Sequence, residues 1–338
     1  MATPTTTATR VAALPAPRGE LTTRLWAVLR CGDSTPVADL VSESDEPFTD
    51  EDLQLALYCC YELHYRGFAG VDDHLEWDPN LLAFRGRLEA RFLEALLPCH
   101  PGTLTPGQAQ DGLRAMAVSA RGPSLSAYLA DPVTGSRDRI EEFLIHRSAY
   151  QLKEADPHTW ALPRLDGQAK AAMVEIQADE YGGGVDGLMH AQLFVDTMRS
   201  VGLDPTYGAY LDRLPAPTLA TVNLATMFGL HRRWRGALVG HLALFEMTSV
   251  VPMGRYAAAL DRIGAGDSGR RFYDVHVIAD AHHQVVALDQ MVAGLLADDP
   301  LLAGDVAFGA ASLTEVELRF SARLLDSWAA GRSSLRSE

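Results

Sequence analysis

The segment FYDVHVIADAHHQVVALDQM, residues 272–291, combines a helical apolar pattern with many titratable side chains. Because an α-helix advances about 100° per residue, His276, Asp280 and His283 fall within a sector of about 60°. His282 and Asp274 point well away from that sector. The segment therefore predicts a long helix that carries two histidines and one aspartate on a single face.

These three side chains offer two imidazoles and a carboxylate, which are ligands that suit iron, manganese or zinc. Histidines are also common on helices, so the alternative is a solvated polar face with a few hydrogen-bonded histidines. A metal site in a helical protein needs ligands from more than one helix. Inward-facing acids elsewhere in the chain would therefore favour the metal site.

Composition narrows the class of protein. The chain has 338 residues, of which 47% are hydrophobic and 22% charged, as expected of a soluble globular protein. Its formal charge is −15, and its basic residues form no run beyond HRRWR at 231–235, which argues against nucleic-acid and membrane partners. No apolar stretch approaches the roughly 18 residues of a membrane span, and the N-terminus does not resemble a signal peptide. We therefore expect a cytoplasmic protein.

The chain shows helical periodicity almost throughout. Residues 1–19 are rich in Thr, Ala and Pro and predict a disordered tail. From residue 20 onward no alternating strand pattern appears. We predict an all-α helical bundle, a single domain over 20–338 with its core at about 100–330 and an N-terminal helical extension at 20–97. The predicted helices include 49–67, 79–97, 107–130, 136–155, 167–181, 185–201, 218–249, 253–264, 270–297 and 312–330.

Two acids lie on the apolar stripes of their predicted helices. On a helical wheel, Glu154 falls within about 40° of Phe143, and Glu180 falls within about 40° of Ile176. An ionised carboxylate that is buried without a partner costs several kcal/mol, so each acid predicts a counter-charge such as a metal ion. The alternative is that both helix ends fray and expose these acids to water.

A third histidine follows a glycine run. His190 lies on an apolar stripe with Leu193 and Phe194, ten residues after Glu180. Ten residues of unbroken helix span about 15 Å, which is too far for two side chains to converge easily. Gly182–Gly184 therefore predict a kink or an unwound turn, unless the two residues serve different metals. A tight helix crossing without chemistry would also explain the glycines.

Together these patterns select six inward-facing side chains: Glu154, Glu180, His190, His276, Asp280 and His283. Such a set is typical of a carboxylate-rich dinuclear iron or manganese site. Ferritin-like sites carry a Glu-x-x-His step on two helices, and this chain contains no Glu-x-x-His. A different helical scaffold is therefore expected.

The sequence resembles the haem-oxygenase-like diiron oxidases and oxygenases, also called iron-containing redox enzymes. The resemblance depends on QLKEADPHTWALPRLDGQAKAAMVEIQADEYGGGVDGLMH at 151–190 and on DVHVIADAHHQ at 274–284. Weaker similarity extends over roughly 48–330. The resemblance implies a haem-oxygenase-like fold and places the family's iron ligands on the same six residues. His146 and Asp179 are candidates to hydrogen-bond to those ligands.

The resemblance also implies the chemistry. Family members bind two Fe(II) ions per chain and use O2 as co-substrate, with an external electron donor in some cases. We expect an oxygenase or oxidase for a small nitrogenous metabolite, with N-oxygenation of an amine, guanidine or amino acid favoured. Alternatives are C–C cleavage or desaturation of an amino or fatty acid, a haem oxygenase, and an inactive metal-binding protein. A homodimer and an electron-transfer partner are also considered.

Overall fold

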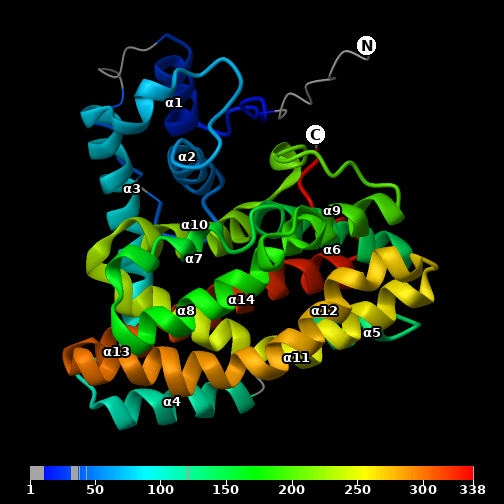
Figure 1. Cartoon of the computed structure of the whole chain (residues 1–338). Coiled ribbons are helices and arrows are strands. Elements are labelled where there is room, and N and C mark those ends of the chain that lie inside the picture. Colours follow the sequence, from blue (N-terminus) through cyan, green and yellow to red (C-terminus); the bar gives the residue numbers. More distant parts are fainter. Residues whose placement is uncertain (1–10, 32–36, 38, 43, 120–121, 338) are drawn as a thin grey trace, which may run out of the picture.

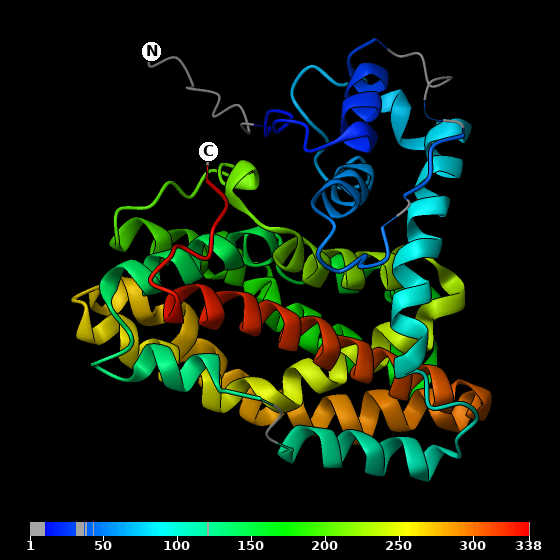
Figure 2. The same cartoon turned by 180° about the vertical axis from the view of Figure 1, so that it is seen from behind.

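The chain is an all-α protein, as the sequence predicts. The computed structural model describes residues 11–31, 37, 39–42, 44–119 and 122–337, and in these residues helices and turns occur without any β-strand. Figures 1 and 2 show the N-terminal helices standing on one end of an elongated bundle formed by the later helices.

The helices vary from single turns to long core helices. The α-helices are α1 (Glu20–Cys31), α2 (Glu51–Glu62), α3 (Pro79–Leu96), α4 (Pro106–Val118), α5 (Leu125–Ala130), α6 (Arg137–Gln151), α7 (Asp156–Thr159), α8 (Gly167–Glu180), α9 (His190–Ser200), α10 (Ala216–Leu230), α11 (Arg235–Arg262), α12 (Gly266–Val285), α13 (Ala293–Asp298) and α14 (Ala303–Ala329). Shorter 3-10 segments are η2 (Asp73–Trp77), η3 (Leu97–Cys99), η4 (Leu162–Arg164), η5 (Gly182–Gly184), η6 (Asp186–Leu188), η7 (Leu211–Arg213), η8 (Arg232–Trp234) and η10 (Pro300–Leu302), and η9 (Val286–Val292) is a π-helix.

The N-terminal helices are joined to the bundle by a shared core. Asp50 caps α2 by accepting hydrogen bonds from the Asp52 and Leu53 amides, and Asp78 caps α3 in the same way. Buried side chains of α1 and α2 belong to the same continuous hydrophobic cluster as those of α10 and α14. Movement of α2 would therefore disturb the bundle as well.

The predicted disordered tail covers residues 1–19. Residues 1–10 lie outside the described residues. Residues 11–19 instead run along the N-terminal helices, where the Ala69 amide donates to the Ala12 carbonyl at 2.8 Å. The buried Trp26 indole donates to the Pro15 carbonyl at 2.5 Å. Residues 11–19 thus form hydrogen bonds with the N-terminal helical segment. The bond at Pro15 is favoured because a buried indole N–H requires an acceptor.

Several helix boundaries differ from the predicted ones. The helix predicted over 107–130 is interrupted between α4 and α5, where Gly122 adopts a φ of +72°. The helix predicted over 218–249 is interrupted by η8. Helix α11 continues through Pro252, where a break was predicted. Packing of α11 against both α12 and α14 maintains the helix despite the missing proline amide.

Helix α11 is the apolar centre of the bundle. The stretch Arg232–Arg262 is long and apolar enough to cross a membrane by length and composition, which corrects the expectation that no such stretch exists. Within its most apolar window, 61% is buried inside the protein. Contact with α12 and α14 gives it the environment of a core helix, which accounts for its apolar sequence.

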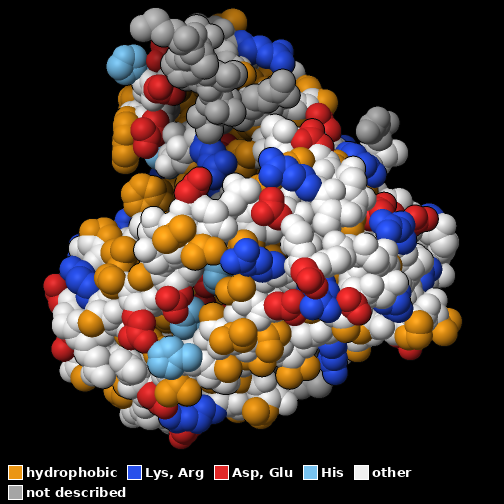
Figure 3. Space-filling model, turned by 45° about the vertical axis from the view of Figure 1, so that its right-hand side comes forward, with side chains coloured by type: hydrophobic (Ala, Val, Ile, Leu, Met, Phe, Trp, Pro, Cys, Tyr) orange, Lys and Arg blue, Asp and Glu red, His pale blue; other side chains and the backbone are white. Residues whose placement is uncertain are grey.

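The surface carries both signs of charge. On the described part of the face in Figure 3, acidic and basic side chains are interspersed with hydrophobic ones, and basic side chains do not form a stripe. This face lacks the positive stripe that binding to a phosphate backbone requires.

Two glycines allow α11 and α14 to approach closely. A Cβ atom at Gly240 would overlap the Val306 backbone carbonyl, and one at Gly309 would overlap the Ala237 carbonyl. Helix α14, red in Figure 2, crosses the bundle along this contact. The two backbones therefore touch where no side chain could fit.

We predict that Gly240→Ala lowers the free energy of unfolding by about 1–3 kcal/mol, because the added methyl group must displace the α14 backbone. Urea unfolding followed by circular dichroism measures the change. Gly254→Ala in the same helix is the matched control, since its Cβ would meet only Val277 Cγ2, at 3.8 Å. The control should gain about 0.5–1 kcal/mol from helix propensity. Equal effects of the two substitutions would contradict close packing at Gly240.

Candidate metal centre

The structure brings all six predicted side chains together in the interior. Helix α12 supplies three of them from one face, the ends of α8 and α9 supply one each, and the turn after α6 supplies the sixth. None is more than 7% exposed: Glu154, Glu180, His190, His276, Asp280 and His283. The alternative of frayed helix ends with solvated acids is therefore wrong.

The glycine run breaks the helix between Glu180 and His190. All three glycines of η5 have positive φ, and a Cβ at Gly182 would overlap the backbone of Leu188. Helix α8 consequently ends at Glu180 and α9 begins at His190. His190 Nδ1 lies 2.8 Å from Glu180 Oε2, so the break lets both side chains reach one point. The predicted unwound turn is confirmed.

Glu154 lies in a turn rather than on a helix. Helix α6 ends at Gln151, whereas the sequence predicted helix through residue 155. Ala155 has a φ of +72°, which an L-residue with a side chain rarely adopts. The Gln177 side-chain amide of α8 donates to the Ala155 carbonyl at 3.0 Å. This turn directs the buried Glu154 carboxylate toward α12.

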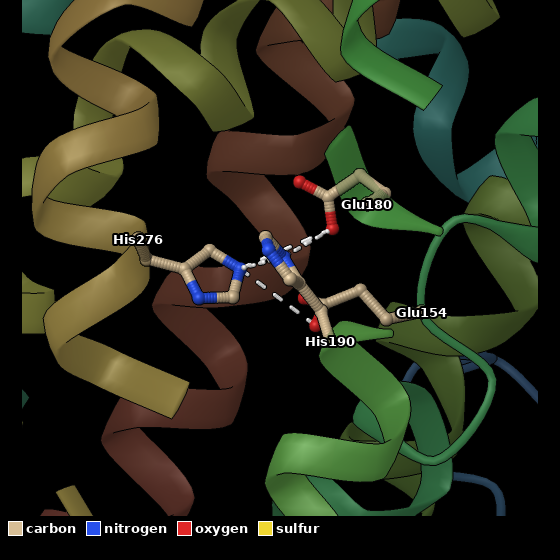
Figure 4. Close-up of side chains that lie close together, drawn as sticks. All are labelled: Glu154, Glu180, His190 and His276. Carbon is tan, nitrogen blue, oxygen red and sulfur yellow. Dashed lines mark hydrogen bonds and ion pairs between the residues drawn. The ribbon is translucent and has the colours of Figure 1, made fainter. Parts of the chain in front are cut away.

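One group of side chains contains two acids and two imidazoles (Figure 4). His276 Nε2 lies 3.1 Å from His190 Nδ1 and 3.7 Å from Glu154 Oε2. His276 Nδ1 is 2.7 Å from the Phe272 carbonyl oxygen. Because a carbonyl only accepts, Nδ1 of the neutral ring carries the proton, and the lone pair of Nε2 faces the group.

A second group shares one acid with the first. Glu180, Asp280 and His283 each place a potential ligand atom within 4.8 Å of the others, and Glu180 also belongs to the first group. His283 Nε2 donates to Asp179 Oδ2 at 3.0 Å, which fixes the ring and directs Nδ1 inward. The prediction for Asp179 as a partner of a candidate ligand therefore agrees with the geometry.

Glu246 of α11 is a further acid at the cluster, which the sequence analysis missed. It is 4% exposed, and its Oε2 lies 3.4 Å from His283 Nδ1. The available signal was a single carboxylate inside the apolar run LVGHLALFEM, residues 238–247. A helix that is buried all round has no polar face on which a helical wheel could separate inward from outward residues.

Other predicted neighbours lie elsewhere. His146 hydrogen-bonds to Thr218 Oγ1 at 2.7 Å and Ser334 Oγ at 2.9 Å, so it does not support a candidate ligand. The prediction failed because α6 ends before Glu154, which removes the helical spacing on which it depended. His282 is outside the cluster as predicted, since its exposed ring bonds to Glu175 Oε1 at 2.8 Å.

Burial and like charge perturb the acids. Burial, assisted by the charges of Glu180 and Asp280, raises the pKa of Glu154 well above its usual value. Burial also raises the pKa of Glu246 to about 8. Burial opposes the charged form of His283, but Asp280 and Glu246 overcome it and raise the His283 pKa to about 11. The metal-free cluster is thus short of positive charge.

Several buried atoms of the cluster lack a hydrogen-bond partner among the described residues. They are Glu154 Oε2, both carboxylate oxygens of Asp280 and His283 Nδ1. Buried polar atoms are normally paired, so these atoms are available for an ion. Imidazole nitrogens and carboxylate oxygens together suit iron or manganese. The residues of either group could hold an ion, and the two groups share Glu180.

Comparison with known proteins identifies the family. Residues 141–318, more than half of the chain, match the family described as iron-containing redox enzyme. The chain belongs to the iron-containing redox enzyme family. It is therefore an oxidoreductase, and its all-α bundle is the haem-oxygenase-like fold. Helices α1–α5 lie outside the matched region.

The chain is also similar to the nitrosourea synthase of Streptomyces achromogenes subsp. streptozoticus. The identity is 28% over 168 residues, which is 48% of this chain and 36% of the relative. The match therefore spans little more than a third of the relative's length, and the relative contains much sequence without a counterpart in the matched region.

We predict that His283→Ala removes a large part of the iron retained after anaerobic loading with ferrous iron, because its Nδ1 faces the second group. His282→Ala is the matched control and should retain the wild-type iron content, since its side chain is 62% exposed and pairs with Glu175. Elemental analysis after gel filtration measures both. Loss of iron from the His282 variant alone would show that α12 has the opposite register.

Repulsion among the buried acids should also loosen the metal-free protein locally. Helix α12 follows Gly264 and Gly266, both with positive φ, which provide a hinge. We predict faster amide hydrogen exchange across 270–285 without iron than with it, and unchanged exchange across 50–97. Identical exchange across 270–285 in both states would indicate a rigid preformed site.

Proposed function

We propose that this protein is a non-haem diiron oxygenase that adds oxygen to the nitrogen of a small amine, guanidine or amino acid. The observation that carries the proposal is the pair of buried ligand groups that share Glu180. The family description supports iron, and the similarity to a nitrosourea synthase, named for a product with an N–N bond, supports a nitrogenous substrate. Activity, metal count and substrate are all part of the proposal.

The proposed ligands divide between two iron ions. Glu154, His190 and His276 would hold the first, Asp280, His283 and Glu246 the second, and Glu180 would lie between them. Two ferrous ions supply the electrons that activate O2. The chain's own residues exclude water and fix the rings: the Phe272 carbonyl orients His276, and Asp179 orients His283.

The proposed reaction needs an electron donor. One oxygen atom of O2 enters the N–H bond of the amine to give a hydroxylamine, and the other leaves as water. Balance requires two electrons and two protons per turnover. The two ferrous ions would deliver these electrons, and we propose that an external donor returns the iron to the ferrous state.

A cavity beside the cluster is the proposed substrate chamber. It has a volume of about 640 Å³ and is lined by residues of α6, α11 and α14 and by residues 116–119 and 122–126. Tyr150 and Phe245 line both this cavity and the small cavity at the cluster. Their rings pack edge to face, with centroids 5.7 Å apart, so the two cavities meet at this pair of rings. A volume of this order suits a small organic ligand.

The same cavity favours a second candidate function. Much of its lining is apolar, with Phe143, Leu244, Met253 and Leu313 among its residues. Its half-buried Arg147 is already paired with both oxygens of Glu317, at 2.9 and 2.8 Å. An apolar chain would also be accommodated, so desaturation or C–C cleavage of a fatty or amino acid is the second candidate.

The test is the product formed by ferrous-loaded protein with ¹⁸O₂, a reductant and a panel of amines, guanidines, amino acids and fatty acids. We predict a nitrogenous product that carries one ¹⁸O atom on nitrogen, as measured by mass spectrometry. Asp280→Ala, which removes a proposed ligand, should give none.

The other outcomes identify the alternatives. If the product is an alkene or a shortened acid, and no ¹⁸O is attached to nitrogen, the second candidate function is correct and N-oxygenation is wrong. Stoichiometric haem with an intense Soret band would indicate a haem oxygenase. Full iron loading without any product would support a metal-binding protein that has lost activity.

A further inference from the structure

A buried ion pair connects the N-terminal helices to the turn that carries Glu154. Lys153 Nζ lies 3.0 Å from Glu62 Oε2, and each side chain is 1% exposed. The Tyr207 hydroxyl donates to the same carboxylate oxygen at 2.7 Å. Glu62 is the last residue of α2 and lies outside the region matched by the family. The contact therefore joins the N-terminal helices to the residue next to a proposed iron ligand.

Aromatic rings from the same part of the chain enclose the lysine. Lys153 Nζ lies 4.8 Å from the ring centroid of Tyr58 and 4.3 Å from that of Tyr65. The faces of such rings attract a cation, and this attraction strengthens when water is excluded. The Tyr65 hydroxyl hydrogen-bonds to Thr226 Oγ1 of α10 at 3.0 Å, which fixes one ring. Lys153 is thus held in a defined position.

A second contact holds the start of the same turn. The Arg66 guanidinium donates to the Leu152 carbonyl at 3.2 Å and stacks over the Tyr207 ring at 4.1 Å. Leu152 is the C-cap of α6, where carbonyl groups lose their helical partners. The turn then passes through the unfavourable backbone conformation of Ala155. Such a conformation persists only where the surroundings hold it in place.

We infer that Glu62 is a positioning residue of the metal centre: through Lys153 it fixes the turn at 152–155 and thereby holds the Glu154 carboxylate at the cluster. The inference rests on the proposed function. Lys153 and Glu154 are consecutive, so their backbones cannot move independently. An ion pair buried this deeply has a narrow geometry, and loss of one partner leaves a charge without compensation.

The decisive variant is Glu62→Gln combined with Lys153→Met. It removes both charges while keeping the side-chain shapes similar, and exchange of a buried ion pair for neutral groups often leaves stability unchanged. Anaerobic titration with cobalt(II), followed by visible absorption, gives a Kd for each of the two sites. We expect one site to bind at least tenfold more weakly and the other to be unchanged, because only the first ligand group contains Glu154.

Glu51→Gln is the matched control. Glu51 is also on α2 and pairs with Arg18 at 2.7 Å and Arg336 at 3.2 Å. Its hydrogen bonds and ion pairs among the described residues are with Arg18, Arg336 and the Ala216 amide rather than with the turn, so both cobalt sites should keep their wild-type Kd values. Tyr207→Phe is a milder variant that removes only the hydroxyl that donates to Glu62, and it should weaken the first site about threefold.

The outcomes separate this inference from the proposed function. If both cobalt sites of the folded double variant keep their wild-type Kd values, the positioning role is overturned and the dinuclear centre is left intact. If the double variant does not fold, wild-type Kd values in Tyr207→Phe lead to the same conclusion. Equal weakening of both sites would also overturn it, because a general loss of stability does not select one site. A wild-type protein with fewer than two cobalt sites would overturn the proposed function itself.

Discussion

Four carboxylates are buried close together at the centre of this helical bundle. Glu154, Glu180, Glu246 and Asp280 lie inside the bundle, where each ionised carboxylate costs several kcal/mol unless a cation compensates it. The His283 imidazole provides part of that charge in the metal-free protein, because Asp280 and Glu246 raise its pKa to about 11. Two ferrous ions would provide the rest. The affinity for metal and the local stability of the bundle are therefore expected to be coupled.

The backbone departs from regular helix where this cluster requires it. Three glycines with positive φ end α8 and start α9, and a turn with Ala155 at positive φ follows α6. Neither feature would be stable in a plain helical bundle, since each sacrifices helical hydrogen bonds. Both bring a side chain from a helix end to α12. Within regular helix, α12 carries His276, Asp280 and His283, whose spacings of four and three residues place them on one face, and α11 carries Glu246.

Much of the site could be predicted because the spacing of residues along a helix determines the face on which their side chains lie. The trio on α12 and the inward stripes of Glu180 and His190 follow from that rule alone. Glu154 was selected for a reason that the structure corrects, since the helix ends before it, and the same error misplaced His146. Glu246 and the continuation of α11 through Pro252 depend on the packing of α11 against other helices, α12 and α14. The hydrophobic pattern within one helix carries no information about its contacts with other helices.

Whether the two ligand groups form one dinuclear centre is the central question. The most direct measurement is the Mössbauer spectrum, with iron analysis, of protein loaded anaerobically with ⁵⁷Fe(II). Because Glu180 belongs to both groups, close to two high-spin ferrous ions per chain are expected, and oxidation should yield a magnetically coupled diferric pair. A single iron per chain, or two ferric ions that remain magnetically independent, would contradict a centre organised around Glu180.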